Sequence, residues 1–175
     1  NRMIYLDNRA TASPYDEIVS HMAYVAANMY GNPSSMHTLG IKAERLVKAA
    51  RESLAKALNA DPREIFFTSC GTESNNMAVR GYLEANPRKG KHIITTAIEH
   101  PSVLEVFKQL GQQGYRVDYL SVDRDGRIRT DELASRICSE TALISLILVN
   151  NETGVIQPID EVAAIRDRIN KSTVI

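Results

Sequence analysis

The stretch LISLILV at residues 143–149, followed by NNETG at residues 150–154, decides the expected fold. An uncharged run of aliphatic side chains, interrupted only by Ser145, is typical of a strand that is covered on both faces. The asparagines and the glycine that follow are typical of a turn. Because strands of this kind occur mainly in parallel sheets, the stretch predicts a sheet with helices on both sides.

The neighbouring segments alternate in the same way. Extended runs at residues 64–68, 91–95, 116–122 and 173–175 lie between helical patterns at residues 72–83, 101–110 and 160–169, with a short helix from Thr130. Strands separated by helices pair in parallel through crossover helices. We therefore predict an α/β fold with a mostly parallel sheet, which we expect to be incomplete because no helix follows the last strand.

The N-terminal part is predicted to be helical. Ser13 is the expected N-cap of a first helix, with Pro14 in its first turn. Turn residues 31–35 then precede a long helix whose apolar stripe runs from Leu39 to Leu58. We expect residues 1–30 to form an N-terminal arm and helix, and residues 31–175 to form part of one large domain.

Composition and charge exclude several classes of function. Lys and Arg number 21 and Asp and Glu number 21, so no net basic field favours nucleic acid or an anionic membrane. No apolar run is long enough to span a bilayer. The two cysteines, Cys70 and Cys138, show no CxxC or metal-ligand spacing, so we predict no metal site. A reducing cytoplasm is the simplest location.

The turn FTSCGTE at residues 67–73 is a candidate anion site. It lies between an expected strand and an expected helix, where free backbone N–H groups and the helix dipole favour a phosphate. Gly71 allows close approach of a ligand, and Thr72 can add a hydroxyl donor. An alternative interpretation is that Thr72 only caps its own helix.

Two further polar turns follow strands. His100 is suited to stacking on a flat ring or to proton transfer, although a lone histidine at this position is more often an ordinary loop residue. Asn151 offers an amide to a ligand, although Asn-Gly turns are common without any function. All three turns are expected at the carboxyl edge of one sheet, where a pocket for a phosphorylated, flat cofactor would form.

At these residues the sequence resembles the cysteine desulfurases, which are fold-type I enzymes that use pyridoxal 5'-phosphate (PLP). The resemblance covers essentially the whole chain, in the order and at the approximate spacing of the family. Its strings are YLDN at 5–8 with Ala10 and Thr11, GNPSS at 31–35 with His37, FTS at 67–69 with GTESNN at 71–76, Glu99-His100, and VNNETG at 149–154 with Gln157-Pro158.

The resemblance implies a role for each matching residue. Gly71 and Thr72 would hold the PLP phosphate, and His100 would stack on the pyridine ring as the catalytic residue. Asn151 would bind the ring hydroxyl near the substrate carboxylate. The other substrate contacts would come from Asn8, Ala10 and Thr11.

The implied activity removes sulfur from L-cysteine and leaves alanine and an enzyme persulfide, for uses such as iron–sulfur cluster assembly. A homodimer and a sulfur-acceptor protein are the implied partners. The family's PLP-binding lysine, its acceptor cysteine and a small C-terminal domain lie beyond the part matched, so we expect this chain alone to be inactive. Cys70 departs from the family, which usually has a glycine there.

Two alternatives stay open. A selenocysteine lyase or an aminotransferase could use the same scaffold, although residues 31–35 and Glu99-His100 favour a desulfurase. A non-catalytic binding module is the third reading. The presence of Thr72, His100 and Asn151 together argues against it.

Overall fold

The computed structural model describes residues 4–175. Contacts between Cα atoms divide the chain into two compact units, one ending at Phe67 and one covering Thr68–Ile175. The assignment of residues 31–175 to one large domain remains a prediction.

The second unit is built on a parallel sheet of three strands in the order β2-β1-β3. The strands are β1 (His92–Thr96), β2 (Arg116–Leu120) and β3 (Thr141–Ile144). Ile93 pairs with Val117 on one side and with Leu143 on the other. Val174 then pairs in parallel with Leu143, so the chain near its end lies along the free edge of β3. The predicted parallel sheet is confirmed.

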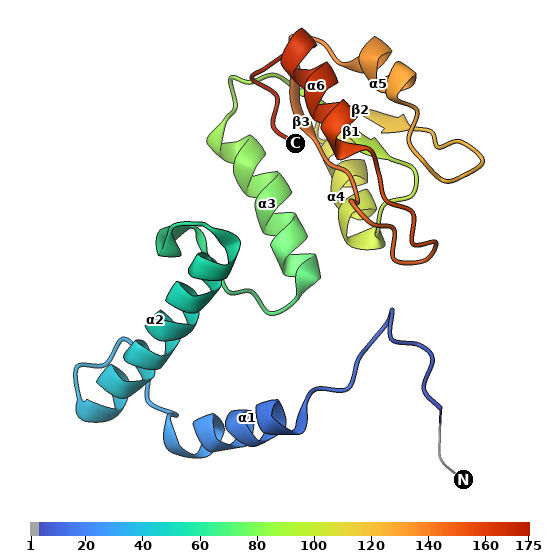
Figure 1. Cartoon of the computed structure of the whole chain (residues 1–175). Helices are drawn as coiled ribbons and strands as arrows, with labels where there is room; N and C mark the ends of the chain where they lie inside the picture. The colour runs from blue at the N-terminus through green and yellow to red at the C-terminus, as the bar shows by residue number, and fades with distance from the viewer. Residues whose placement is uncertain (1–3) are drawn as a thin grey trace. The chain divides into compact units, whose positions relative to one another are not determined.

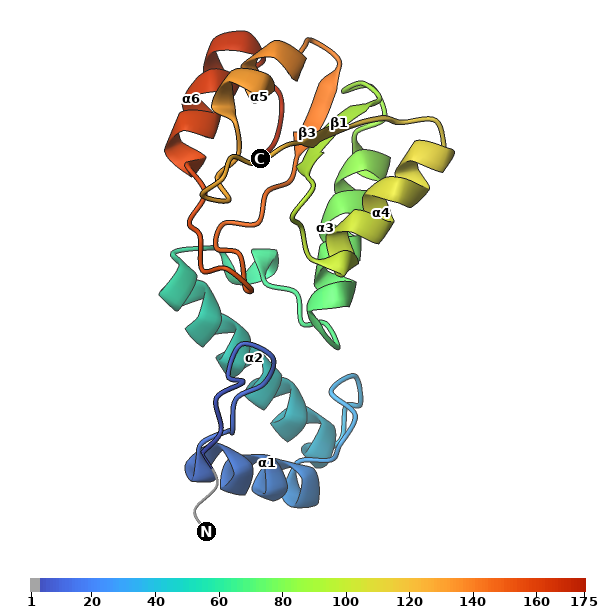
Figure 2. The same ribbon diagram turned by 90° about the vertical axis from the view of Figure 1, so that its right-hand side faces the viewer.

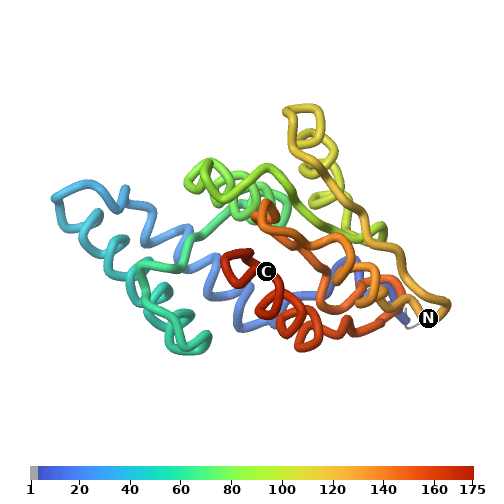
Figure 3. The backbone as a smooth tube through the Cα atoms, turned by 90° about the horizontal axis from the view of Figure 1, so that it is seen from above, coloured from blue at the N-terminus to red at the C-terminus, as the bar shows by residue number. Residues whose placement is uncertain are grey.

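Helices cover both faces of this sheet (Figures 1 and 2). Helices α3 (Gly71–Ala85) and α4 (Pro101–Gln112) lie on one side, and α5 (Thr130–Arg136) and α6 (Ile159–Ile169) lie on the other. Figure 3 follows the same alternation along the backbone, from the green α3 to the red α6. Every residue of β1 is buried, the polar His92, Thr95 and Thr96 as well as the apolar Ile93 and Ile94, because β1 is the central strand between two helical layers.

Two apolar cores result, because successive strand residues point to opposite faces. Ile93 packs with Val79 and Leu83 of α3 and with Phe107 of α4. Ile94, the next residue, packs in a second core with Leu120, Leu133, Ile144 and Val162. The sheet is thus the middle layer of an α/β/α arrangement.

The first unit contains α1 (Asp16–Asn28), α2 (Thr38–Leu58) and a short 3-10 helix, η1 (Pro62–Glu64). The turn at residues 31–35 packs closely on α2, because a Cβ at Gly40 would overlap the carbonyl oxygen of Ser35. Asn59 ends α2 in a left-handed conformation, with its N–H bonded back to the last turn. Among the described residues, no helix combines the length and apolarity that crossing a bilayer requires.

Three expected element boundaries are wrong. Residues 64–68 form no strand, because Asp61 and Glu64 cap η1 and leave Phe66 and Phe67 exposed. β3 ends at Ile144 rather than Val149, and Leu148 and Val149 are exposed. α1 begins at Asp16 after Tyr15, so Ser13 is not its N-cap.

Candidate functional site at the carboxyl edge of the sheet

The carboxyl ends of β1 and β3 form a topological switch point. The chain leaves β1 into α4 on one face and leaves β3 towards α6 on the opposite face, as the two cores show. Neighbouring parallel strands whose connections diverge in this way leave a crevice at their carboxyl ends, where ligands of open α/β sheets bind. His100 and Asn151 follow these two strands.

His100 is held in a defined orientation at the start of α4. It is the N-cap residue, and its Nδ1 accepts a hydrogen bond from the Ser102 N–H over 3.1 Å. The Ser102 hydroxyl lies 2.8 Å from the same Nδ1 and accepts a bond from the Asn75 amide over 2.8 Å. Because Nδ1 acts as an acceptor, a neutral ring carries its proton on Nε2. The ring is exposed, and within residues 4–175 no hydrogen bond is found at Nε2.

The N-terminus of α3 provides the anion-binding element that the sequence predicts. Within the described residues, no backbone carbonyl accepts from the N–H groups of Gly71 or Thr72. A Cβ built at Gly71 meets no other described atom within 4 Å, so the space beside the first turn is open. The Glu73 carboxylate already occupies part of this end. It accepts one hydrogen bond from the Ser69 N–H over 2.6 Å and another from the Ser69 hydroxyl over 2.7 Å.

The pKa of Cys70 indicates that the N-terminus of α3 favours negative charge. Its exposed thiol has a pKa below the ordinary value, chiefly through hydrogen bonding from the backbone of Glu73 and then from the Ser69 hydroxyl. Thr72 contributes through both its backbone and its side chain. A site that stabilises a thiolate in this way also favours other anions, phosphate among them.

The structure brings Thr72 and His100 together. Both line a shallow hollow of about 330 Å³ between α3 and α4, together with Asn76, Ser102 and Gln109. Two of the three polar turns predicted from the sequence therefore meet at one place.

Asn151 lies in the turn after β3 and is exposed. Its neighbour Asn150 holds this turn, because its side-chain oxygen accepts from the N–H groups of Glu152 and Thr153 over 3.0 and 2.9 Å. The Asn150 amide donates to the Ile98 carbonyl over 3.2 Å and so joins this turn to the turn before His100. Asn150 thus has a structural role, and Asn151 remains free to meet a ligand.

Glu99 has a structural role at this edge that was not predicted from the sequence. It is 7% exposed, and its Oε1 accepts from the Thr96 hydroxyl over 2.9 Å and from the Ile147 N–H over 2.7 Å. These bonds connect the ends of β1 and of the segment after β3. A single glutamate before a histidine carries no local signal for such a role, which depends on a partner 48 residues away.

Asn8, Ala10 and Thr11 lie in the first unit, where they belong to a closed loop. The Tyr5 hydroxyl bonds the Asp7 and Thr11 carbonyl groups, each over 3.1 Å, and lies 2.6 Å from the Thr11 hydroxyl. The N–H groups of Ala10 and Thr11 both donate to the Asp7 carbonyl. The loop is ordered within its own unit, and the substrate role of its residues remains a prediction.

A parallel α/β/α unit with a free helix N-terminus and an oriented histidine at its switch point belongs to the class of phosphate- and cofactor-binding folds. The chain belongs to the aminotransferase class-V family, whose profile matches residues 4–175.

Known proteins similar to the chain make the resemblance specific. A cysteine desulfurase of Trichormus azollae is 50% identical over 160 residues, which are 91% of this chain and 40% of that protein. A solved NifS-like protein has a TM-score of 0.91 at 41% identity and is matched over 95% of this chain and 46% of its own. A structure titled SspA in complex with cysteine has a TM-score of 0.84 at 33% identity, over 91% of this chain and 46% of its own.

The predicted resemblance to cysteine desulfurases is confirmed. It spans about two fifths of the length of the curated relatives.

Proposed function

We propose that this chain is the cofactor-binding part of a PLP-dependent cysteine desulfurase that acts on L-cysteine. The observation that carries the proposal is the meeting of Thr72 and His100 at one hollow on the carboxyl edge of the sheet. The cysteine desulfurases among its relatives, and the cysteine-bound SspA structure, support the choice of substrate.

The residues at the start of α3 fit the phosphate of PLP. Gly71 and Thr72 offer N–H groups that no described backbone carbonyl uses, and Thr72 adds a hydroxyl. The positive end of the α3 dipole and the open space at Gly71 favour a bound dianion. The Glu73 carboxylate opposes it, although Ser69 already compensates that charge in part.

The residues after β1 and β3 fit the ring of the cofactor. The exposed imidazole of His100 presents a flat face, and its Nε2 holds a proton that it can exchange with a bound substrate. Asn151 would donate its amide to the ring hydroxyl. When bound, PLP supplies the electron sink that lets bonds at the α- and β-carbons of an amino acid break.

The catalytic test is the release of sulfide and alanine from L-cysteine by the whole gene product with PLP. The family supplies its lysine and acceptor cysteine outside the part matched here, so the whole product is needed. We expect alanine and sulfide in equal amounts in the presence of a thiol reductant. Transfer of the amino group to a 2-oxo acid without sulfide would instead identify an aminotransferase, and a strong preference for L-selenocysteine would identify a lyase.

Two variants connect this activity to the site. Thr72→Ala is expected to weaken PLP binding about tenfold, which corresponds to one lost charge-assisted hydrogen bond. His100→Ala is expected to lower turnover by about 10²-fold or more through loss of proton transfer. Thr130→Ala, which removes the same hydroxyl from the first turn of α5, is the matched control and should leave both unchanged. Equal losses in all three variants would contradict the assignment.

A further inference from the structure

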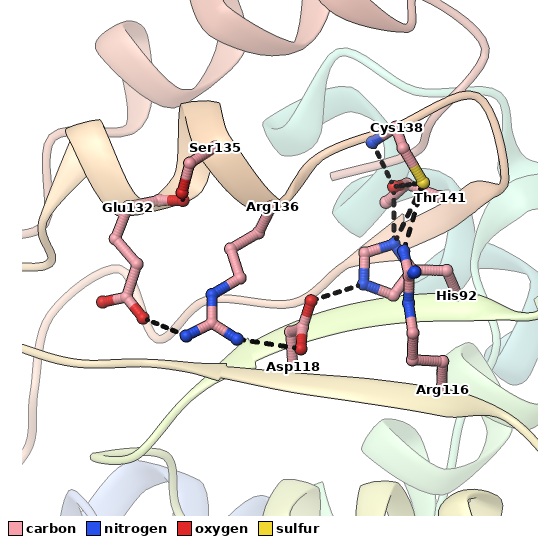
Figure 4. A network of polar contacts seen from close by, with 8 residues as sticks. All are labelled: His92, Arg116, Asp118, Glu132, Ser135, Arg136, Cys138 and Thr141. Carbon is pink, nitrogen blue, oxygen red and sulfur yellow. Dashed lines mark hydrogen bonds and ion pairs between the residues drawn. The ribbon is translucent and has the colours of Figure 1, made fainter.

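A second polar cluster lies at the amino ends of the strands (Figure 4). His92 is the first residue of β1, and Thr141 is the first residue of β3. Four residue steps along β1 separate His92 from Thr96, which is about 13 Å. The cluster is therefore at the opposite end of the sheet from the candidate cofactor site, and nothing in the proposed function uses it.

The centre of the cluster is the buried ring of His92. Its side chain is 1% exposed, its Nε2 lies 2.9 Å from the Asp118 carboxylate, and its Nδ1 lies 2.7 Å from the Thr141 hydroxyl. Because a carboxylate only accepts, Nε2 carries the ring proton, and Nδ1 is left as an acceptor in a neutral ring. Burial lowers the pKa of His92, which favours this neutral form.

A basic residue shares the Asp118 carboxylate with the ring of His92. Arg136, on α5, contacts Asp118 over 3.1 Å and Glu132 over 3.0 Å. Both carboxylate oxygens of Asp118 therefore have a partner, one in His92 and the other in Arg136. Arg116, which lies on β2 as Asp118 does, makes a separate contact with its guanidinium.

The Arg116 guanidinium contacts the thiol of Cys138. Arg116 Nη2 donates to Cys138 Sγ over 3.2 Å, and the Thr141 hydroxyl and His92 Nδ1 lie 3.6 and 3.7 Å from the same sulfur. Cys138 lies in the segment between α5 and β3. It is partly exposed, so small solutes reach it.

These contacts favour the thiolate. Burial raises the pKa of Cys138, but hydrogen bonds from the Thr141 hydroxyl, the Glu140 backbone and Arg116 outweigh it, and the pKa is lowered. A thiolate beside an arginine, at a partly exposed position, is the environment of a reactive cysteine.

We propose that Cys138 is a reactive thiol that hydroperoxides oxidise to a sulfenic acid. Hydrogen peroxide is small and uncharged, so a partly exposed sulfur admits it. The Arg116 guanidinium is a donor beside the sulfur, and its N–H groups can bind a peroxide oxygen while the sulfur attacks.

The step is balanced as follows. Cys138 releases its thiol proton to solvent, and the thiolate sulfur attacks one peroxide oxygen. The S–O bond forms as the O–O bond breaks, so the sulfur loses two electrons and the peroxide gains them. The leaving hydroxide takes a proton from solvent, and the products are one sulfenic acid and one water.

The test uses the Cys70→Ser chain, in which Cys138 is the only thiol. After treatment with hydrogen peroxide and dimedone, the intact mass should show one adduct, and the Cys70→Ser/Cys138→Ser chain should show none. The rate of alkylation by iodoacetamide should have its pH midpoint below the ordinary thiol value of about 8.5. A midpoint at or above that value, or no dimedone adduct, would overturn the proposal.

Three arginine variants separate the role of Arg116 from general charge. Arg116→Gln, in the single-cysteine chain, should slow alkylation at pH 7 by about three- to tenfold and raise the midpoint. Arg116→Lys should restore most of the rate, because it keeps the cation. Arg124→Gln removes an equal charge from an exposed position beyond the other end of β2 and should change nothing. Identical rates for Arg116→Gln and Arg124→Gln, with equal far-UV circular dichroism, would refute the mechanism.

Discussion

The buried carboxylate of Glu99 accepts a hydrogen bond from the backbone N–H of Ile147 over 2.7 Å. This bond holds the segment after β3 beside the end of β1, directly before His100. Glu99→Ala should lower the free energy of unfolding by about 1–3 kcal/mol, because it leaves the Ile147 N–H and the Thr96 hydroxyl without their acceptor. Glu99→Gln keeps an oxygen for both donors and should cost much less. Urea denaturation of the two variants compares these effects, and equal losses would show that the acceptor is unimportant.

The burial of Glu99 also predicts how the free energy of unfolding depends on pH. Burial raises the pKa of Glu99, so the folded state favours the protonated form. The stability that this group contributes is fully present below its unfolded pKa of about 4.3 and is lost as the pH rises through the folded pKa. Glu99→Gln should therefore gain stability relative to the wild type between pH 4 and pH 8. A constant difference over that range would mean that Glu99 does not titrate in the folded protein with a raised pKa.

His92 should act in the opposite direction. Because its folded pKa is lowered by burial, its contribution is present above the unfolded pKa of about 6.5 and is lost as the pH falls through the folded pKa. The wild type should lose stability between pH 7 and pH 5, and His92→Gln should lose less. His21→Gln, on α1, is the control and should follow the wild-type slope. Equal slopes for all three proteins would remove His92 as the cause.

Gly90 and Gly114 both have positive φ angles, 115° and 93°, but their surroundings differ. A Cβ at Gly90 would overlap the Glu140 carbonyl, whereas a Cβ at Gly114 meets nothing within 4 Å among the described residues. Gly114→Ala should cost about 1 kcal/mol of backbone strain. Gly90→Ala adds a backbone clash beside the Cys138 cluster and should cost at least about twice as much. Thermal unfolding measures both, and a smaller loss at Gly90 would contradict the described packing.

Ser102 orients the ring of His100, and a tautomer measurement tests this. In the neutral form of His100, the imidazole nitrogen shifts should show the proton mainly on Nε2, because Nδ1 accepts from Ser102. Ser102→Ala should reduce this preference, and Ser135→Ala, which removes a hydroxyl bonded within α5, should not. A wild-type ring protonated mainly on Nδ1 would contradict the described geometry.

The parallel sheet could be predicted because alternating strands and helices force parallel pairing. The meeting of Thr72 with His100 was expected from a strand at residues 64–68, which the structure does not contain. The two residues meet instead because α3 packs beside α4 on one face of the sheet. The errors came from apolar runs. Phe66 and Phe67 resemble a strand locally, yet the Asp61 and Glu64 capping box and the stacking of Arg51 over the Phe67 ring hold that segment outside any sheet.

The polar cluster around His92 and Cys138 could not be predicted in the same way. His92, Asp118 and Cys138 belong to three separate segments, and none stands in a recognisable motif. Their meeting depends on the strand register, in which His92 pairs with Arg116 and with Thr141. Only the three-dimensional structure gives that register.

Backbone amide NMR during titration with PLP tests whether the start of α3 and His100 form a site for this cofactor. The largest shifts should occur at Gly71, Thr72 and His100, inorganic phosphate should reproduce those at Gly71 and Thr72, and borohydride should leave the intact mass unchanged at 19.4 kDa. Shifts centred on the N-terminus of another helix, or none at saturating PLP, would contradict the account. A borohydride-fixed adduct would show that a lysine of this chain binds the cofactor, contrary to our expectation.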